Sequence, residues 1–125
     1  MLNNVRAELK RLHSPDVHDL RTYKPENDHN FGLLLQLMVG PYGESGAESF
    51  DVLLCTPEWL KQHNKASDLV WGRHLLIVFK YDHDRLFHFL QEYCAQCSGN
   101  TWKEIAEKLG RVAKWEFEDY KSAVS

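Results

Sequence analysis

The amino-acid sequence predicts an α+β fold, with a mostly antiparallel sheet of about five strands and two main helices packed on one face. Strand-like apolar segments fill the first two thirds of the chain, whereas helical spacing of apolar residues begins only after residue 82. Elements grouped in this order are typical of α+β folds. The length of 125 residues and an apolar content of 43% favour one folded domain over residues 1–125.

Three early segments have the patterns of strands. Residues 3–13 alternate between apolar and charged side chains, which is typical of a half-buried strand. After a Pro-containing loop over residues 14–30, residues 31–40 are apolar on both faces. This pattern predicts a central strand that is covered on both sides, or on one side and by a partner. Residues 50–55 form the next strand, and the Gly-rich connection 41–49 makes the pair a long-loop β-hairpin.

The middle of the chain contains the first helix signals. A Thr-Pro pair at the start of residues 56–64 predicts one or two helical turns. Residues 73–81 are strongly apolar and are expected to form a third major strand. Asp82 then caps a predicted helix over residues 82–97, and a Gly-Asn pair soon afterwards stops it.

The chain is expected to end with a second helix and a last strand. Thr101 and Glu104 form a Thr-x-x-Glu capping box, which marks the start of the helix. Over residues 114–120, "KWEFEDY", the apolar period becomes two. Trp115 and Phe117 would then face the core, and the carboxylates between and after them would face solvent. A helical continuation is the alternative for this segment.

Charge is distributed unevenly along the chain. Residues 25–60 contain no lysine or arginine and six carboxylates. Such a segment favours a basic partner and disfavours direct binding of nucleic acid, which requires a basic surface; a solvated acidic surface is the alternative. No apolar run is long enough to span a membrane, and the N-terminus lacks the core of a signal peptide, so a cytoplasmic protein is expected.

Catalytic and metal-binding motifs find little support. Cys94 and Cys97 form a Cys-x-x-Cys pair, but they lie at the end of a predicted helix, where the helix dipole disfavours a thiolate. Packing is the favoured role, and no second pair supplies a zinc site with Cys55. Glu116 and Glu118 would share an exposed strand face, which does not tune a proton donor. The sequence therefore predicts no catalytic residue, no metal site and no cofactor.

Four blocks, taken in order, carry a resemblance to a known family. They are "FDVLLCTPEWL" at 50–60, "GRHLLIVFKYDHDRL" at 72–86, "TWKEIAEKL" at 101–109 and "WEFEDY" at 115–120. Together they resemble the immunity protein 8 family of bacterial polymorphic toxin systems over about residues 48–120. The resemblance implies a small cytoplasmic α+β protein that binds and blocks the C-terminal domain of a secreted toxin. Such toxins are often nucleases with basic clefts, and the family supplies no catalytic residues.

The partner is therefore expected to be a cognate, basic toxin domain, and the oligomeric state is left open. The candidate contact residues come from the Gly-rich connection and from the terminal acids: Tyr42, Glu44, Glu48, Glu116, Glu118 and Asp119. Two other classes compete with this hypothesis. One is a small thiol- or metal-dependent enzyme that uses Cys94 and Cys97, and the other is a general protein-interaction domain.

Overall fold

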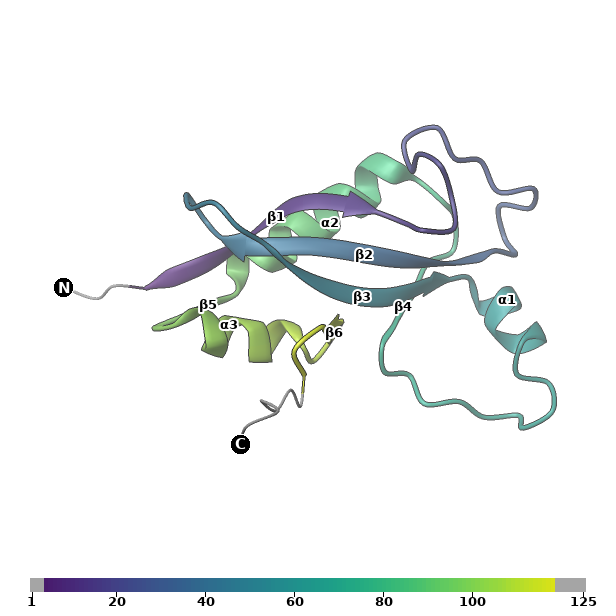
Figure 1. Cartoon of the computed structure of the whole chain (residues 1–125). Coiled ribbons are helices and arrows are strands. Elements are labelled where there is room, and N and C mark those ends of the chain that lie inside the picture. The colour runs from purple at the N-terminus through teal and green to yellow at the C-terminus, as the bar shows by residue number, and fades with distance from the viewer. Residues whose placement is uncertain (1–3, 119–125) are drawn as a thin grey trace.

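The computed structural model describes residues 4–118 and contains a six-stranded mixed sheet with three helices (Figure 1). The sheet is curled into a half-barrel. Its longest strands are β1 (Val5–His13), β2 (Gly32–Pro41) and β3 (Glu48–Cys55), which pair antiparallel in sequence order. The predicted α+β class is confirmed.

Two short strands share the outer edge of β3. β6 (Lys114–Trp115) pairs antiparallel with its first half, and β4 (Leu75–Ile77) pairs parallel with its second half. The sheet is therefore mixed and not mostly antiparallel. A parallel pair needs a long crossover connection, and residues 56–74 supply it. The sequence pattern shows that 73–81 is extended, but it does not show the direction of the strand or its length of only three residues.

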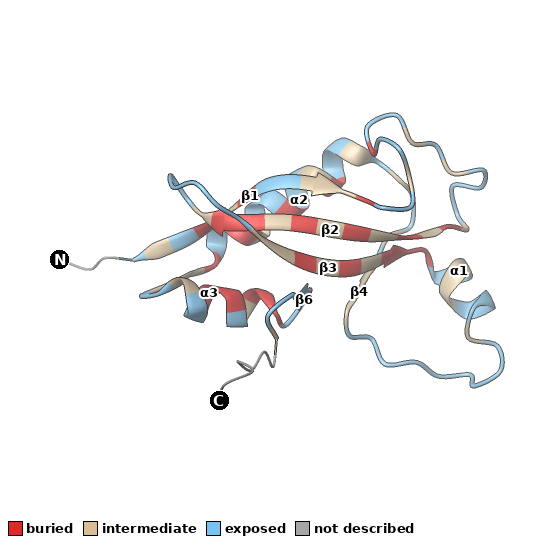
Figure 2. Ribbon diagram, viewed as in Figure 1, coloured by how far each residue is buried: buried red, intermediate tan, exposed pale blue. Residues whose placement is uncertain are grey.

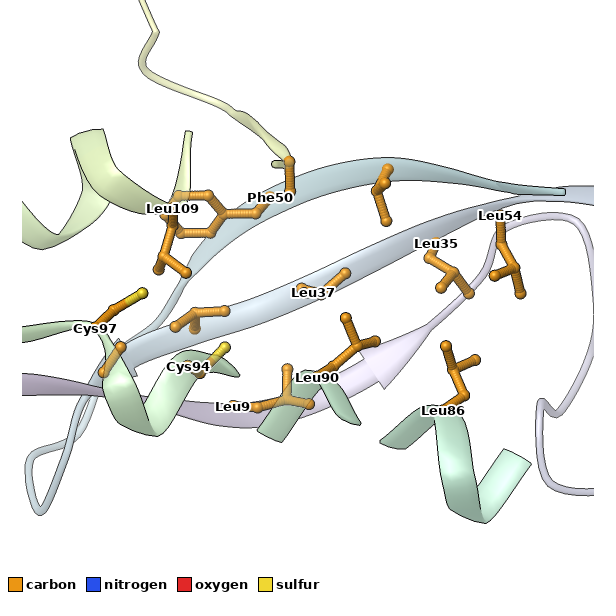
Figure 3. Packing of buried hydrophobic residues seen from close by; sticks show 14 of the residues in the cluster. Leu9, Leu35, Leu37, Phe50, Leu54, Leu86, Leu90, Cys94, Cys97 and Leu109 are labelled. Carbon is orange, nitrogen blue, oxygen red and sulfur yellow. The ribbon is translucent and has the colours of Figure 1, made fainter. Parts of the chain in front are cut away.

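The core lies between the inner face of the sheet and two helices, α2 (His83–Gln96) and α3 (Trp102–Leu109). Along β2, every second side chain is buried, and the side chains between them are half-buried (Figure 2). The predicted central strand is thus fully covered on one face. Figure 3 shows leucines of the strands packed against Leu86, Leu90 and Cys94 of α2 and Leu109 of α3.

The hydrogen bonds of the N-cap residues confirm the predicted helix starts. The Asp82 carboxylate accepts a hydrogen bond from the Arg85 backbone N–H at 3.2 Å. Thr101 and Glu104 form the reciprocal capping box of α3. Thr56 caps the short helix α1 (Pro57–Gln62). α2 ends at Gln96, before the predicted Gly-Asn break, and the residues after it form the two-residue strand β5 (Ser98–Gly99), which pairs with the start of β1.

The terminal strand is shorter than the sequence pattern predicts. β6 ends at Trp115, because the Glu118 backbone N–H donates to the Trp115 carbonyl at 3.0 Å and closes a turn. Phe117 lies in this turn, 39% exposed, so the expectation that it faces the core is wrong. Trp115 is half-buried, as a strand residue packed against the core.

Candidate partner-binding surface

The β2–β3 hairpin presents two of the candidate contact residues, Tyr42 and Glu44. Its connection turns at Gly43 and Gly46, whose φ angles of 78° and 99° favour glycine. The Arg6 guanidinium lies 3.9 Å from the centre of the Tyr42 ring, a cation–π contact. Lys10 Nζ donates to the Glu44 carbonyl at 2.6 Å, while the Glu44 side chain is exposed and has no partner among residues 4–118. The hairpin is thus held in place from β1 and carries one available carboxylate.

Glu48 has a structural role that the sequence pattern does not indicate. Its Oε1 accepts hydrogen bonds from two indole N–H groups, Trp102 Nε1 at 2.6 Å and Trp115 Nε1 at 2.9 Å. These tryptophans belong to α3 and β6, so one carboxylate oxygen ties both elements to β3. Glu48 is half-buried as a result.

Glu116 lies beside the start of β3. Its Oε1 accepts from the Ser49 backbone N–H at 2.8 Å, and its own N–H donates to the Ser49 carbonyl at 3.0 Å. Within the same strand pair, Asp51 lies opposite Lys114. Glu116 therefore meets the segment 25–60, which contains no lysine or arginine, although it lies 67 residues from Ser49 in the chain.

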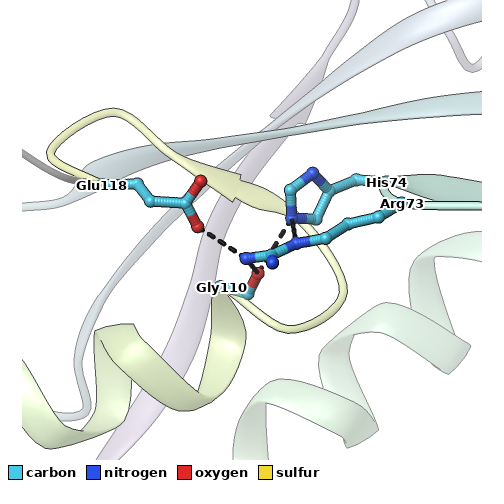
Figure 4. Close-up of polar contacts among 4 residues, drawn as sticks. All are labelled: Arg73, His74, Gly110 and Glu118. Carbon is cyan, nitrogen blue, oxygen red and sulfur yellow. Dashed lines mark hydrogen bonds and ion pairs between the residues drawn. The ribbon is translucent and has the colours of Figure 1, made fainter. Parts of the chain in front are cut away.

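Glu118 belongs to a polar network at the junction of β4, α3 and the turn after β6 (Figure 4). Arg73 Nη2 donates to Glu118 Oε1 at 2.7 Å and to the Gly110 carbonyl at 3.1 Å. His74 Nε2 lies 2.9 Å from the same carbonyl and 2.8 Å from Arg73 Nε, and it can serve one of them at a time, according to its tautomer. We call these four residues the Arg73 network. It holds the two short strands on the edge of β3.

The six candidates thus divide into three groups. Tyr42 and Glu44 lie on the exposed hairpin, and Glu48, Glu116 and Glu118 each accept hydrogen bonds from the chain itself. Asp119 lies outside the described residues. Sequence reasoning could place the acids on a surface, but their internal partners depend on how β6 docks.

The three cysteines are buried and lie on or beside the core. Burial raises the pKa of the Cys94 thiol from its ordinary value of 9.0 to about 12, with a smaller effect from Cys97. Burial also raises the pKa of Cys55 and Cys97. A nucleophilic cysteine requires a lowered thiol pKa and access to substrate. The geometry therefore supports the packing role and argues against thiolate chemistry.

Thiol labelling is expected to follow from this burial. A reagent that attacks the thiolate, such as DTNB at about pH 8, should react slowly with the folded protein and rapidly in urea. The pKa of a cysteine in the unfolded chain lies near its ordinary value, whereas burial raises the pKa of Cys94 in the folded protein to about 12. The contribution of the Cys94 thiol to stability is therefore full below about pH 9 and is lost as the pH rises toward 12. Fast labelling of Cys94 in the folded protein would contradict its buried position.

Residues 4–118 contain neither a cluster of metal ligands nor a membrane-spanning helix. No three histidine, cysteine or acidic side chains in this range gather closely enough to hold a metal ion. No helix in the same range has both the length and the apolar character needed to cross a bilayer.

The structure also exposes an apolar surface that the sequence pattern missed. Ile77 of β4 and Phe79 after it are 45% and 75% exposed, and Phe89 on α2 is 56% exposed. They line a groove of about 610 Å³ between residues 76–82 and the first turns of α2. In the sequence, the one signal for this exposed apolar surface is the position of Phe89 beside the apolar stripe of its predicted helix. The apolar run 73–81 predicts a strand, and this pattern does not indicate that its second half is exposed.

The model of the family described as "Immunity protein 8" matches residues 7–120. The match extends the resemblance seen over residues 48–120 toward the N-terminus, so β1 and β2 are included. No curated protein and no solved structure matches the chain. Because the family model covers most of its length, the chain belongs to the immunity protein 8 family.

Proposed function

We propose that this protein is an immunity protein that binds and neutralises the C-terminal domain of a cognate secreted toxin. Membership of its family over residues 7–120 is the observation that carries the proposal. In this proposal the chain acts as a single domain over residues 1–125, in the cytoplasm of the producing bacterium. It blocks the toxin by binding and has no catalytic step of its own.

The charge distribution supports a basic toxin domain, of which a nuclease is the clearest example. A nuclease cleft must attract phosphate, so it presents cationic side chains. Residues 25–60 offer carboxylates without any lysine or arginine, and Glu116, directly after β6, lies next to them. Such an acidic partner speeds association with a basic cleft and can occupy the place of phosphate.

The contacts are proposed to centre on the hairpin and on the turn after β6. Tyr42 and Glu44 project from the hairpin and would touch the toxin directly. Glu116 is exposed and uses one carboxylate oxygen for Ser49, so its second oxygen can accept from a partner. Glu48 and Glu118 would act mainly by holding this surface in shape, and Asp119, which lies outside the described residues, stays a predicted contact.

Reversal of the charge at Glu44 tests these contacts. The Glu44→Lys variant should bind the C-terminal domain of the cognate toxin about tenfold more weakly, with an unchanged melting temperature, because the carboxylate has no partner within residues 4–118. The loss should shrink in high salt. Titration calorimetry or biolayer interferometry would measure the Kd.

A matched control is available at the other end of β2. Glu26→Lys makes the same charge change on an exposed loop residue of the same acidic segment. Its affinity should stay close to that of the wild type. Equal losses in both variants would indicate a long-range effect of net charge, and an unchanged Kd in Glu44→Lys would remove this residue from the interface.

A further inference from the structure

The outer edge of β4 has backbone groups that no strand satisfies. In the parallel register of β3 and β4, the His74 carbonyl and the Val78 N–H face β3, where they bond to Leu53 and Cys55. The N–H and C=O of Ile77 therefore point away from β3. β4 is the last strand on this side of the described sheet, so both groups are unpaired within residues 4–118. An edge of this kind can pair with an added strand.

A groove for side chains runs beside this edge. Residues 76–82 form one wall, α2 forms the other with Arg85 and Phe89, and the buried leucines Leu54 and Leu86 lie beneath. We call it the β4 groove. Its volume of about 610 Å³ is large enough for one or two apolar side chains of a bound segment. Backbone pairing next to apolar pockets is how added strands are recognised.

The charges at the rim indicate what kind of segment fits. Lys80 and Arg85 are exposed, and neither side chain has an ion-pair or hydrogen-bond partner within residues 4–118. The one acid of the lining, Asp82, already accepts from the Arg85 N–H as the cap of α2. Two cations and one carboxylate leave the rim with a net charge of +2 − 1 = +1, which complements an apolar segment that carries a carboxylate.

We infer that the β4 groove is a docking site for an extended segment of the toxin domain, which adds a strand to β4 and carries apolar and acidic side chains. The inference rests on the proposed function, because it takes the occupant to be the toxin. A second copy of this chain fits less well, since it would bring the same two cations, Lys80 and Arg85, to a rim that is already cationic. β4 and β6 both pair with the outer edge of β3. One partner can therefore contact both the β4 groove and the surface beside β6.

A proline at residue 77 tests strand addition directly. Proline is tolerated where the N–H of an edge strand faces outward, so Ile77→Pro should fold with nearly the wild-type melting temperature. It should bind the C-terminal domain of the cognate toxin at least tenfold more weakly, because the donor is lost. Ile77→Ala keeps the N–H and removes the side chain, and its loss of affinity should be several-fold smaller. Equal Kd values for Ile77→Pro and the wild type would overturn the inference.

Charge reversal tests the rim independently of the backbone. Lys80→Glu should weaken toxin binding about tenfold, and the control Lys65→Glu, on the exposed α1–β4 connection, should not. Equal Kd values for Lys80→Glu and the wild type, or equal losses in the two variants, would contradict the inference.

Sedimentation of the wild type tests the remaining occupant of the β4 groove, a second copy of this chain. A concentration-dependent dimer that Ile77→Pro abolishes would assign the groove to a second copy and overturn the inference, whereas a monomer supports it. Failure of the wild type itself to bind the toxin domain would instead refute the proposed function, so the two failures can be told apart.

Discussion

Replacement of Phe50 by alanine is expected to lower the free energy of unfolding by about 3–5 kcal/mol, the usual cost of emptying a buried aromatic position. Phe50 is 1% exposed and lies where β3, β6 and α3 meet. Its ring stacks on Trp115 and meets Trp102 edge-on, with centroid distances of 6.4 Å in both cases. A cavity of about 140 Å³ already borders the Phe50 side chain. Few side chains on that side are therefore close enough to move into the space that alanine would leave. Urea denaturation would measure the loss.

Phe117→Ala is the matched control, because it removes the same side chain from a turn. Phe117 is 39% exposed and contacts Trp115 edge-on at 5.9 Å. Its loss should cost less than half as much as that of Phe50, because less apolar surface returns to water. Equal costs for the two variants would mean that Phe117 is buried, as the strand pattern alone suggests.

The second large effect is expected at Glu48. Glu48→Ala should reduce the free energy of unfolding by about 2–3 kcal/mol, since two half-buried indole N–H groups lose their acceptor together. The fluorescence of Trp102 and Trp115 should change in the folded state as their surroundings open to water. Urea denaturation followed by fluorescence reports both quantities.

Glu48→Gln separates the hydrogen bonds from the charge. Glutamine keeps a carbonyl oxygen at the same place, so this variant should retain most of the stability that alanine loses. If alanine and glutamine were equally destabilising, the carboxylate charge would be the important feature. If neither changed stability, Glu48 would be a solvated surface acid and not the link between α3, β6 and β3.

Local signals in the sequence predict the helix starts well. Thr56, Asp82 and the Thr101–Glu104 capping box act on backbone groups within four residues, so their effect is visible in the sequence itself. The apolar runs that predict β2 and β3 are equally local, but residues 31–40 are apolar on both faces, and the docked helices decide which of their side chains are buried.

Features that depend on distant partners could not be predicted in this way. The parallel direction of β4 follows from the path of residues 56–74, and its length follows from the space that β6 leaves on the edge of β3. Phe117 has the spacing of a strand residue, but the turn closed by Glu118 removes it from the strand. No local sequence pattern indicates the direction and length of β4 or the turn that contains Phe117.

The prediction of the contact residues was incomplete for the same reason, because their hydrogen bonds depend on distant parts of the chain. Acid composition identified Glu48, Glu116 and Glu118, but their hydrogen bonds come from α3, β3 and the Arg73 network. Conversely, Phe79 and Lys80 lie within a run that a sequence pattern assigns to a strand, and only the docking of α2 reveals the β4 groove. Hydrophobic periodicity reports which residues can be buried and not which remain open to a partner.

Co-expression with the toxin tests the central claim most directly. The C-terminal domain of the cognate toxin would be produced in a sensitive bacterium, with and without this protein, and surviving cells would be counted. An immunity protein should restore growth to nearly the level of cells without toxin, and the two chains should purify together. Unprotected cells containing folded, soluble protein that does not purify with the toxin domain would contradict the proposed function.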